Sequence, residues 1–422
     1  MTATDTHRAI EAVWRIESAR LIAGLARVVR DVGRAEELAQ DALVTALEQW
    51  PRAGIPDNPG AWLMATAKHR AIDHLRREQM LTRQHAVLAR ELETEQGVNG
   101  TSVETGADDE IGDDLLKLMF TACHPVLSRE ARTALSLKVL AGLTTLEIAR
   151  AFLVPETTMA QRIVRAKRTL SDARVPFEIP RRQNLAARLA SVLEVIYLVF
   201  NEGYAATAGE DWMRPALCEE ALRLGRILAE LAPLEAEVHG LVALMEIQAS
   251  RIRARVNASG EPILLLEQNR ARWDRLLIHR GLLALARGER QGTVRGPYLL
   301  QAAIAACHAR ALTAGDTDWV NIAALYDELA RIAPTPVVEL NRAVAVSMAY
   351  GPAAGLELTD KLAADGALES YHLLPSVRGD LLKKLGRHDE ARGEFERAAL
   401  LTHNARESRL LLERAAACAP QS

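Results

Sequence analysis

One acidic stretch divides this sequence into separate parts. Between Glu91 and Asp114 there is no lysine or arginine, acidic residues recur throughout, and glycines interrupt any helical pattern. Such a segment cannot bury enough apolar surface to offset the entropy lost on ordering. We therefore expect a flexible acidic linker over residues 91–113, with independently folded modules on either side.

The remainder of the chain has the composition of helices. Ala, Leu, Arg and Glu dominate the long stretches and aromatic residues make up only 4%. These residues lose little rotamer freedom in a helix. A chain of 422 residues also exceeds the roughly 250 to 300 residues that one core serves. We expect an all-α protein with two small helical modules, residues 1–90 and 114–176, and a C-terminal α-helical repeat domain over residues 177–422.

The first module is predicted to contain three helices. Apolar residues at helical spacing favour one helix over Ile10–Val32, broken at Gly33, and a second over Ala35–Trp50. After a loop rich in proline and glycine, a third helix runs over about Gly60–Gln79. Its polar side is basic. Taken alone, this side is typical of a solvated helix face.

The second module contains a helix-turn-helix pattern. Thr144 and Glu147 form a capping-box sequence, a short break ends at Pro155, and a second helix follows over Glu156–Asp172. On that helix the residues predicted to be buried are Met159, Ile163, Ala166 and Leu170. The residues predicted to face outward are Thr158, Gln161, Arg162, Arg165 and Arg168. Arg and Gln suit base edges in a DNA major groove, and few acidic partners are available for a merely structural surface face.

The extension ends in a pattern close to a tetratricopeptide repeat, carried by Gly379, Leu382, Gly386, Ala391, Phe395 and Ala398. We expect stacked helical hairpins there. Asn201, Glu202, Gly203 and Tyr204 are candidates for a regulatory or ligand site. A tight turn after a buried helix would explain Gly203 equally well, and both interpretations remain open.

The chain contains no recognisable catalytic or metal motif. Cys123, Cys218, Cys307 and Cys418 are dispersed without a paired-cysteine motif, so we expect small core residues and no metal site. There is no Gly-rich phosphate loop or nucleophile elbow, and we expect neither an enzyme nor a cofactor. The start is polar, and the longest apolar run, Val192–Phe200, is short for a membrane span. We expect a cytoplasmic protein without membrane contact.

The order of these parts resembles the extracytoplasmic-function (ECF) sigma factors of the sigma-70 family. Residues 34–43 look like region 2.2, residues 61–77 like regions 2.3 and 2.4, and residues 147–149 and 156–167 like the region 4 helix-turn-helix. The extension is similar to that of a subgroup with a fused tetratricopeptide-like domain. The resemblance implies a transcription initiation factor whose partners are core RNA polymerase and promoter DNA.

Three sets of site residues are carried over by this resemblance. Those implied to dock on core polymerase are Glu37, Leu38, Gln40, Asp41 and Val44. Those implied to bind the minus-10 element are Lys68, His69, Arg70, Asp73, Arg76 and Arg77. Those implied to bind the minus-35 element are Thr158, Gln161, Arg162, Arg165, Lys167 and Arg168.

Two functions are weighed on these grounds. The first is a sigma factor whose extension replaces or supplements an anti-sigma factor, either by folding against the two modules and holding them closed or by offering a surface to a regulatory protein or ligand. The alternative is a helix-turn-helix regulator with a repeat domain that is not a polymerase subunit. Such a regulator has no use for the helices of the first module, and co-purification with core polymerase separates the two functions.

Overall fold

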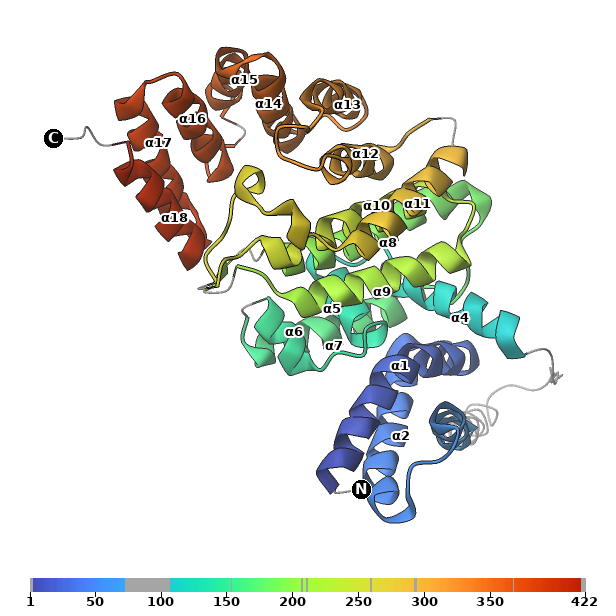
Figure 1. Cartoon of the computed structure of the whole chain (residues 1–422). Coiled ribbons are helices and arrows are strands. Elements are labelled where there is room, and N and C mark those ends of the chain that lie inside the picture. The colour runs from blue at the N-terminus through green and yellow to red at the C-terminus, as the bar shows by residue number, and fades with distance from the viewer. Residues whose placement is uncertain are drawn as a thin grey trace, which may run out of the picture. The chain divides into compact units, whose positions relative to one another are not determined.

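The structure is a computed structural model made almost entirely of helices (Figure 1). It describes residues 3–72, 107–152, 154–205, 208–209, 212–258, 260–291, 294–366 and 368–418. The chain divides into an N-terminal unit, Met1–Val195, and a C-terminal unit, Ile196–Ser422, with the boundary inside helix α8. The all-α prediction is confirmed.

The N-terminal unit begins with α1 (Ala3–Val29) and α2 (Val32–Ala53), and residues 59–72 are helical as well. The break expected at Gly33 lies instead just before α2, and Gly33 is inside that helix. Asp31 causes this shift because its carboxylate accepts a hydrogen bond of 2.8 Å from the backbone N–H of Arg34, satisfying one of the unpaired donors of the helix start. Glycine is not needed as the breaker.

Four helices follow in the same unit: α4 (Ala107–Ala122), α5 (Arg129–Val139), α6 (Thr145–Ala151) and α7 (Glu156–Asp172). Helix α4 starts inside the stretch expected to be a linker. The capping box is confirmed, since the Thr144 hydroxyl accepts from the Glu147 N–H and the Glu147 carboxylate accepts from the Thr144 N–H. Helix α7 has the predicted bounds.

The first half of α8 (Arg182–Tyr204) packs within the N-terminal unit. Arg188 donates a hydrogen bond of 2.6 Å to the Phe120 carbonyl, and Ser191 donates one of 2.6 Å to the Cys123 carbonyl. Residues 183–204 are long and apolar enough to cross a membrane by length and composition, but 44% of the most apolar window is buried inside the protein. Glu194 of the same helix makes an ion pair of 2.5 Å with Arg129 of α5.

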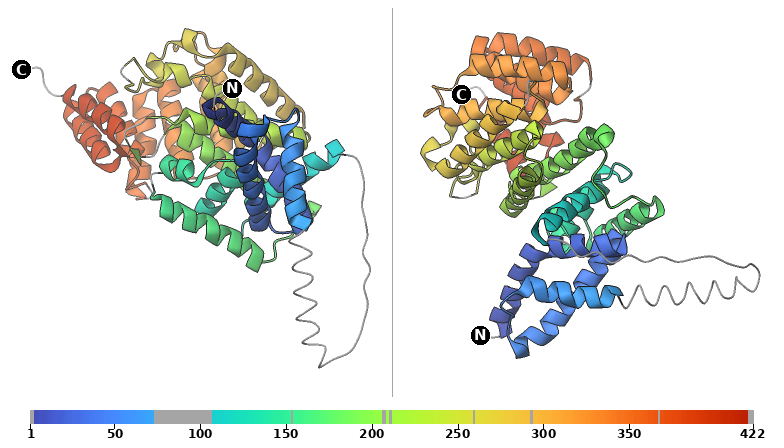
Figure 2. Two further views of the ribbon diagram at one scale, coloured as in Figure 1. Left: turned by 90° about the horizontal axis from the view of Figure 1, so that it is seen from below. Right: turned by 90° about the vertical axis from the view of Figure 1, so that its right-hand side faces the viewer.

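The C-terminal unit is a succession of helices joined by short connections (Figures 1 and 2). They are α9 (Pro215–Leu231), α10 (Ala236–Ala249), α11 (Arg275–Gln291), α12 (Pro297–Arg310), α13 (Trp319–Ile332), α14 (Pro336–Tyr350), α15 (Pro352–Ala364), α16 (Leu373–Lys384), α17 (His388–Leu401) and α18 (Ala405–Ala416). Most pack against their sequence neighbours. Two-residue strands, β1 (Ala208–Gly209) and β2 (His403–Asn404), pair in parallel.

Helices α10 and α12 form the centre of the largest core in this unit. Both are buried on nearly all sides, and they approach closely at Gly240, where an added Cβ would lie 2.6 Å from the backbone nitrogen of Leu299. A larger residue there would separate the two helices. This close approach lets Leu299 and Leu300 fill the space between them.

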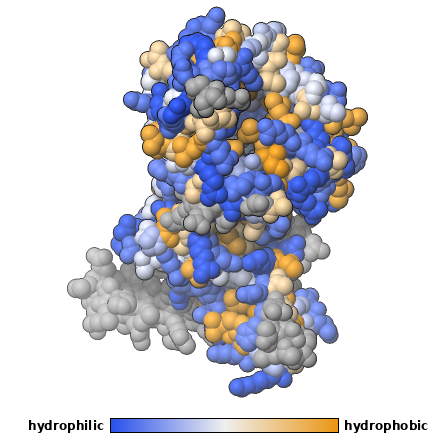
Figure 3. Space-filling model, turned by 60° about the vertical axis from the view of Figure 1, so that its left-hand side comes forward, coloured by the Kyte–Doolittle hydropathy of each residue, from blue (hydrophilic) through white to orange (hydrophobic). Residues whose placement is uncertain are grey.

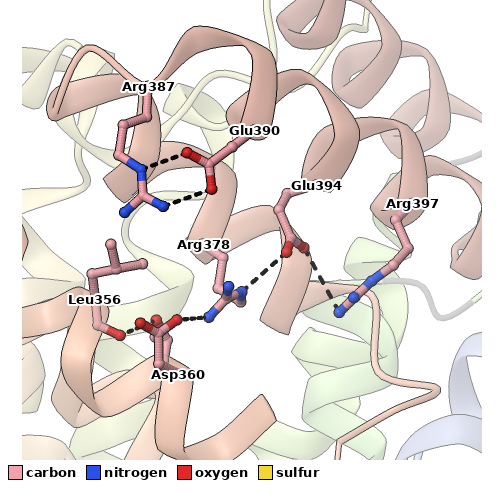
Figure 4. A network of polar contacts seen from close by, with 8 residues as sticks. Leu356, Asp360, Arg378, Arg387, Glu390, Glu394 and Arg397 are labelled. Carbon is pink, nitrogen blue, oxygen red and sulfur yellow. Dashed lines mark hydrogen bonds and ion pairs between the residues drawn. The ribbon is translucent and has the colours of Figure 1, made fainter. Parts of the chain in front are cut away.

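The last helices contain the residues of the repeat-like pattern. Gly379, Leu382, Ala391, Phe395 and Ala398 are buried between α16 and α17, and Gly386 ends α16 with a positive φ of 77°. At the surface Arg378 joins α15 to α17 through Asp360 and Glu394 (Figure 4). The helical hairpin is therefore confirmed. Its assignment as a tetratricopeptide repeat stays a prediction.

All four cysteines are free and buried, as expected for core residues. Burial raises the pKa of Cys123 to about 11, and its sulfur lies 3.3 Å from the Ser136 hydroxyl. Within the described residues, no group of three or more His, Cys, Asp or Glu side chains could hold a metal ion. On the face in Figure 3, hydrophilic residues cover most of the surface and hydrophobic residues lie in scattered groups.

Candidate nucleic-acid interface

Helix α7 separates its polar face from its buried face as the spacing predicts. Met159, Ile163, Ala166 and Leu170 are all buried, with Met159 fully inaccessible. On the other side Thr158, Gln161, Arg165 and Arg168 are exposed, and Arg162 is partly exposed. The helix therefore presents a polar, cationic face to solvent from a fixed apolar base.

The cations of this face have few acidic neighbours. Arg168 makes an ion pair of 3.5 Å with Asp172, and both side chains are highly exposed, so this pair is weak. Arg165 makes no ion pair among the residues that the structure describes. Its guanidinium is free to form bidentate hydrogen bonds with a base edge or a phosphate.

Lys167 lies in a different environment from the rest of the predicted minus-35 set. Its ammonium pairs with Glu36 of α2, and the ammonium of Lys138 in α5 lies 3.7 Å from the other oxygen of the same carboxylate. Glu36 is only 2% exposed. Gln40 donates a further hydrogen bond to it. We call Glu36, Lys138 and Lys167 the buried ion triad; it joins the first predicted module to the second.

Helix α2 places the predicted polymerase-docking residues on two sides. Glu37 and Asp41 are exposed, and Val44 is 52% exposed despite being apolar. Leu38 is buried at 4% exposure, and Gln40 turns toward the ion triad. Glu37, Asp41 and Val44 are therefore the exposed members of this set.

Of the predicted minus-10 residues, Lys68, His69 and Arg70 are exposed. Arg70 lies across from α2, with its guanidinium 3.3 Å from the Asp41 carboxylate and 2.8 Å from the Thr45 hydroxyl. The structure therefore brings one predicted minus-10 residue and one predicted polymerase-docking residue together. The rest of the set, Asp73, Arg76 and Arg77, lie outside the described residues.

A second set of contacts connects α1 with the helix-turn-helix. Arg15 makes an ion pair of 3.0 Å with Glu147, the same residue that completes the capping box. Gly142 has a positive φ of 67°, and a Cβ added there would lie 2.6 Å from the Ser18 hydroxyl oxygen. The chain thus approaches α1 closely just before α6 begins.

A cleft of about 590 Å³ lies where α1 and α2 face the end of α7. Four cationic side chains are among its lining residues: Arg27, Arg30, Lys167 and Arg174. Arg27 also pairs with the buried Asp114 of α4 at 3.3 Å. A cationic cleft therefore lies beside the point where the start of α2 meets α7.

The sequence reading missed Glu36 and Lys138 as functional candidates. Its place near the start of a helix, where negative charge is favourable, explains Glu36 without any partner. A signal was present, because Glu36 lies four residues after Val32 and three before Ala39, both of which are buried. A carboxylate on the apolar stripe of a helix is buried at a cost unless a cation or a hydrogen-bond donor pairs with it, so its position predicts such a partner.

The structure packs the Asn201–Tyr204 segment tightly within the C-terminal unit. Glu202 pairs with Arg214, and Tyr204 lies under the guanidinium of Arg255, 3.7 Å from the ring centroid. Gly203 is in the last turn of α8, so the tight-turn interpretation is wrong. It is required because an added Cβ would lie 2.6 Å from the Cys218 backbone nitrogen. A regulatory role for the segment stays a prediction.

Comparison with known proteins identifies three matching segments. Residues 16–80 match the model for sigma-70 region 2, and residues 117–170 match the model for sigma-70 region 4. Residues 188–289 match a family of unknown function (DUF6596). An uncharacterized protein of Rhizobium meliloti (strain 1021) is 43% identical over 385 residues, which is 91% of this chain and 90% of that protein.

Proposed function

Because the chain belongs to the sigma-70 family, as an ECF-like sigma factor with a C-terminal extension, we propose that it selects promoters by reading two separate DNA elements. Helix α7 reads the minus-35 element, and the basic residues from Lys68 to Arg77, of which the first three lie on the helix of residues 59–72, bind the minus-10 element. The protein acts in the cytoplasm as a subunit of RNA polymerase and catalyses no reaction itself.

The outward face of α7 is the observation that carries this proposal. Gln161 and Arg165 are exposed there, above a stripe of buried apolar residues that holds the helix in the helix-turn-helix. The recognition helix of such a motif enters the major groove, where Arg pairs with guanine and Gln with adenine. Arg162 and Arg168 are suited to neighbouring phosphates.

Docking on core polymerase is assigned to the exposed part of α2. Glu37, Asp41 and Val44 combine two carboxylates with an apolar side chain that is 52% exposed. A partner with basic and apolar residues would complement this surface. Arg70 already neutralises Asp41 in the free protein, so docking must rearrange that pair.

We further propose that the structure represents a closed, resting form. The minus-35 and minus-10 elements lie about 25 base pairs apart, which is about 85 Å at roughly 3.4 Å per pair. The buried ion triad instead connects α2 directly to α5 and α7. The two modules must separate before they occupy both elements, and the triad must break when they do.

The Arg165→Ala variant tests the reading of the minus-35 element. Removing a base-contacting arginine is expected to cost about 1 to 3 kcal/mol and to relax the base preference at one position. The measurement is transcription by core polymerase plus this protein on a library of promoters with randomised minus-35 and minus-10 elements. The matched control is Arg174→Ala, which follows the end of α7. An unaltered minus-35 preference in the Arg165 variant would contradict the assignment of Arg165 to base reading. If the parent protein gives no defined start sites, the proposed function as a whole is wrong.

A truncated chain ending at Val195 tests whether the extension holds the closed form. The cut falls after the contacts of Arg188, Ser191 and Glu194, so it keeps the part of α8 that packs against α4 and α5. If the extension favours closure, its loss raises promoter-specific transcription by roughly 5-fold or more. This value is the lower end of the range found for allosteric coupling between two parts of a protein. Unchanged or reduced output from a folded truncated protein would refute this role.

A further inference from the structure

Helix α11 presents a basic face that no part of the proposed function uses. Its exposed arginines are Arg275, Arg280, Arg287 and Arg290, and His279 and two exposed leucines, Leu276 and Leu283, lie among them. We call the four arginines the α11 basic face. The helix lies in the C-terminal unit (Figure 1), and all but its last two residues fall in the segment that matches the family of unknown function.

The positions of these residues follow from the way α11 packs. Ile278, Gly281, Ala284, Leu285 and Gly288 are its buried residues. Gly281 lies against Ile247 and Gly288 against Leu299, so this side is fixed on α10 and α12. At 100° per residue the cations and the two leucines fall within the opposite half of the helix. From residue 275 to residue 290 this face extends over about 22 Å.

The charge of this face has no acidic counterpart within the part of the chain that the structure describes. Arg275, Arg280, Arg287 and Arg290 make no ion pair among the residues that the structure describes. Glu289, the acidic residue of α11, lies toward its edge and pairs with Arg295 at 3.5 Å. By contrast, several exposed arginines elsewhere in the same unit have acidic partners, such as Arg387 with Glu390 in Figure 4. An acid-free row of arginines along one helix is suited to binding an external polyanion.

The composition of the face favours DNA over a protein partner. Charged residues are depleted in the buried core of protein–protein interfaces. Here Leu276 and Leu283 lie near the middle of the face, but four arginines flank them and no acidic residue lies among them, so the cationic side chains outnumber the large apolar ones. Protein–DNA interfaces are much more positive, and arginine binds phosphate with two parallel hydrogen bonds. A face of about 22 Å equals the axial rise of roughly six base pairs.

We propose that the α11 basic face binds the phosphate backbone of the promoter duplex, so that the extension adds a third, sequence-independent DNA contact. The inference rests on the proposed function, because it is as a polymerase subunit that the protein reaches promoter DNA. Backbone contacts fix position and affinity but carry no base information. The extension thus contributes to binding strength without changing which promoters are selected.

The test replaces four arginines together, R275Q/R280Q/R287Q/R290Q, in the full-length protein bound to core polymerase. Binding to a fluorescent promoter fragment is measured over a series of salt concentrations. Each lost phosphate contact removes about 0.9 from the slope of log K against log salt, so the slope falls by roughly three to four. Affinity at about 0.1 M salt falls at least tenfold. The start sites and base preferences stay the same.

Three controls make the result specific. The first, R387Q/R392Q/R397Q/R409Q, removes the same charge from exposed arginines that are paired with glutamates, and it should leave the slope close to that of the parent. The second, R275K/R280K/R287K/R290K, keeps the charge and should keep most of the slope. The third, L276A/L283A, should not alter DNA binding. Thermal melting by circular dichroism checks that each variant is folded.

The possible outcomes separate this inference from the function on which it rests. A glutamine variant whose slope equals that of the charge-matched control overturns the inference, while promoter selection by the parent still supports the proposed function. If the leucine variant loses transcription and the arginine variant keeps its salt dependence, the face binds a protein and the inference is also overturned. A parent that binds no promoter with core polymerase overturns the proposed function itself.

Discussion

Replacing Glu36 by alanine is expected to lower the free energy of unfolding of the N-terminal unit by about 3 kcal/mol, because two ammonium groups would lose their buried counter-ion. Glu36 is 2% exposed, and the side chains of Lys138 and Lys167 are 15% and 18% exposed, so water cannot fully replace the carboxylate. Urea denaturation, combined with hydrogen exchange of peptides from α5 and α7, measures the loss. Exchange should rise most in these two helices.

The neighbouring residue supplies a matched control for this prediction. Glu37 carries the same side chain on the next position of α2, but it is exposed and pairs with Arg34 at the surface. Its replacement by alanine should cost about 0 to 1 kcal/mol. A triple variant, Glu36→Leu with Lys138→Met and Lys167→Met, should recover most of the lost stability because it leaves no charge buried. Equal losses for Glu36→Ala and Glu37→Ala would contradict the buried ion triad.

The triad also connects stability with function. If the closed form rests on it, the Glu36→Ala protein should occupy open states more often than the parent. Opening would uncover Lys167 beside the rest of the α7 polar face, where it could reach a phosphate. Lys167 would then have two roles. In the closed protein its ion pair with Glu36 stabilises closure, and in the open protein its ammonium binds DNA.

Replacing Phe395 by alanine is expected to destabilise the helices α16 to α18 by about 3 to 5 kcal/mol, as large-to-small changes do in packed cores. Phe395 is fully buried, and its ring fills the space left by Gly379. The Arg414 guanidinium lies 4.3 Å from the ring centroid and would lose this contact as well. Thermal melting and hydrogen exchange of α16 to α18 report the effect.

Leu400→Ala is the control on the same helix. Leu400 is 85% exposed, so its removal should change the free energy of unfolding by no more than about 0.5 kcal/mol. Phe395→Leu should fall between the two because it keeps part of the buried volume. If Phe395→Ala and Leu400→Ala cost the same, the hairpin core described by the structure is wrong.

Local pattern alone was sufficient for much of this protein. The helix-turn-helix, the capping box of Thr144 and Glu147, the bounds of α7 and its buried stripe all follow from spacing and capping chemistry within a few turns of chain. The outward cations of α7, including Arg165, follow from the same periodicity. These features depend on residues no more than about four positions apart, and that is the range over which helical geometry operates.

Other features were decided only by contacts between distant residues. Helices α10 and α12 are buried on nearly all sides, so their sequences carry no polar stripe that would show which side faces the core. Gly203 and Gly240 are needed because another helix approaches them closely, not because of their own backbone angles. Glu36 resembles a solvated residue in the first turns of α2 until Lys138 and Lys167, more than 100 residues away in the chain, lie beside it. Burial and pairing depend on which surfaces meet in the folded protein, and helical spacing within one segment does not contain that information.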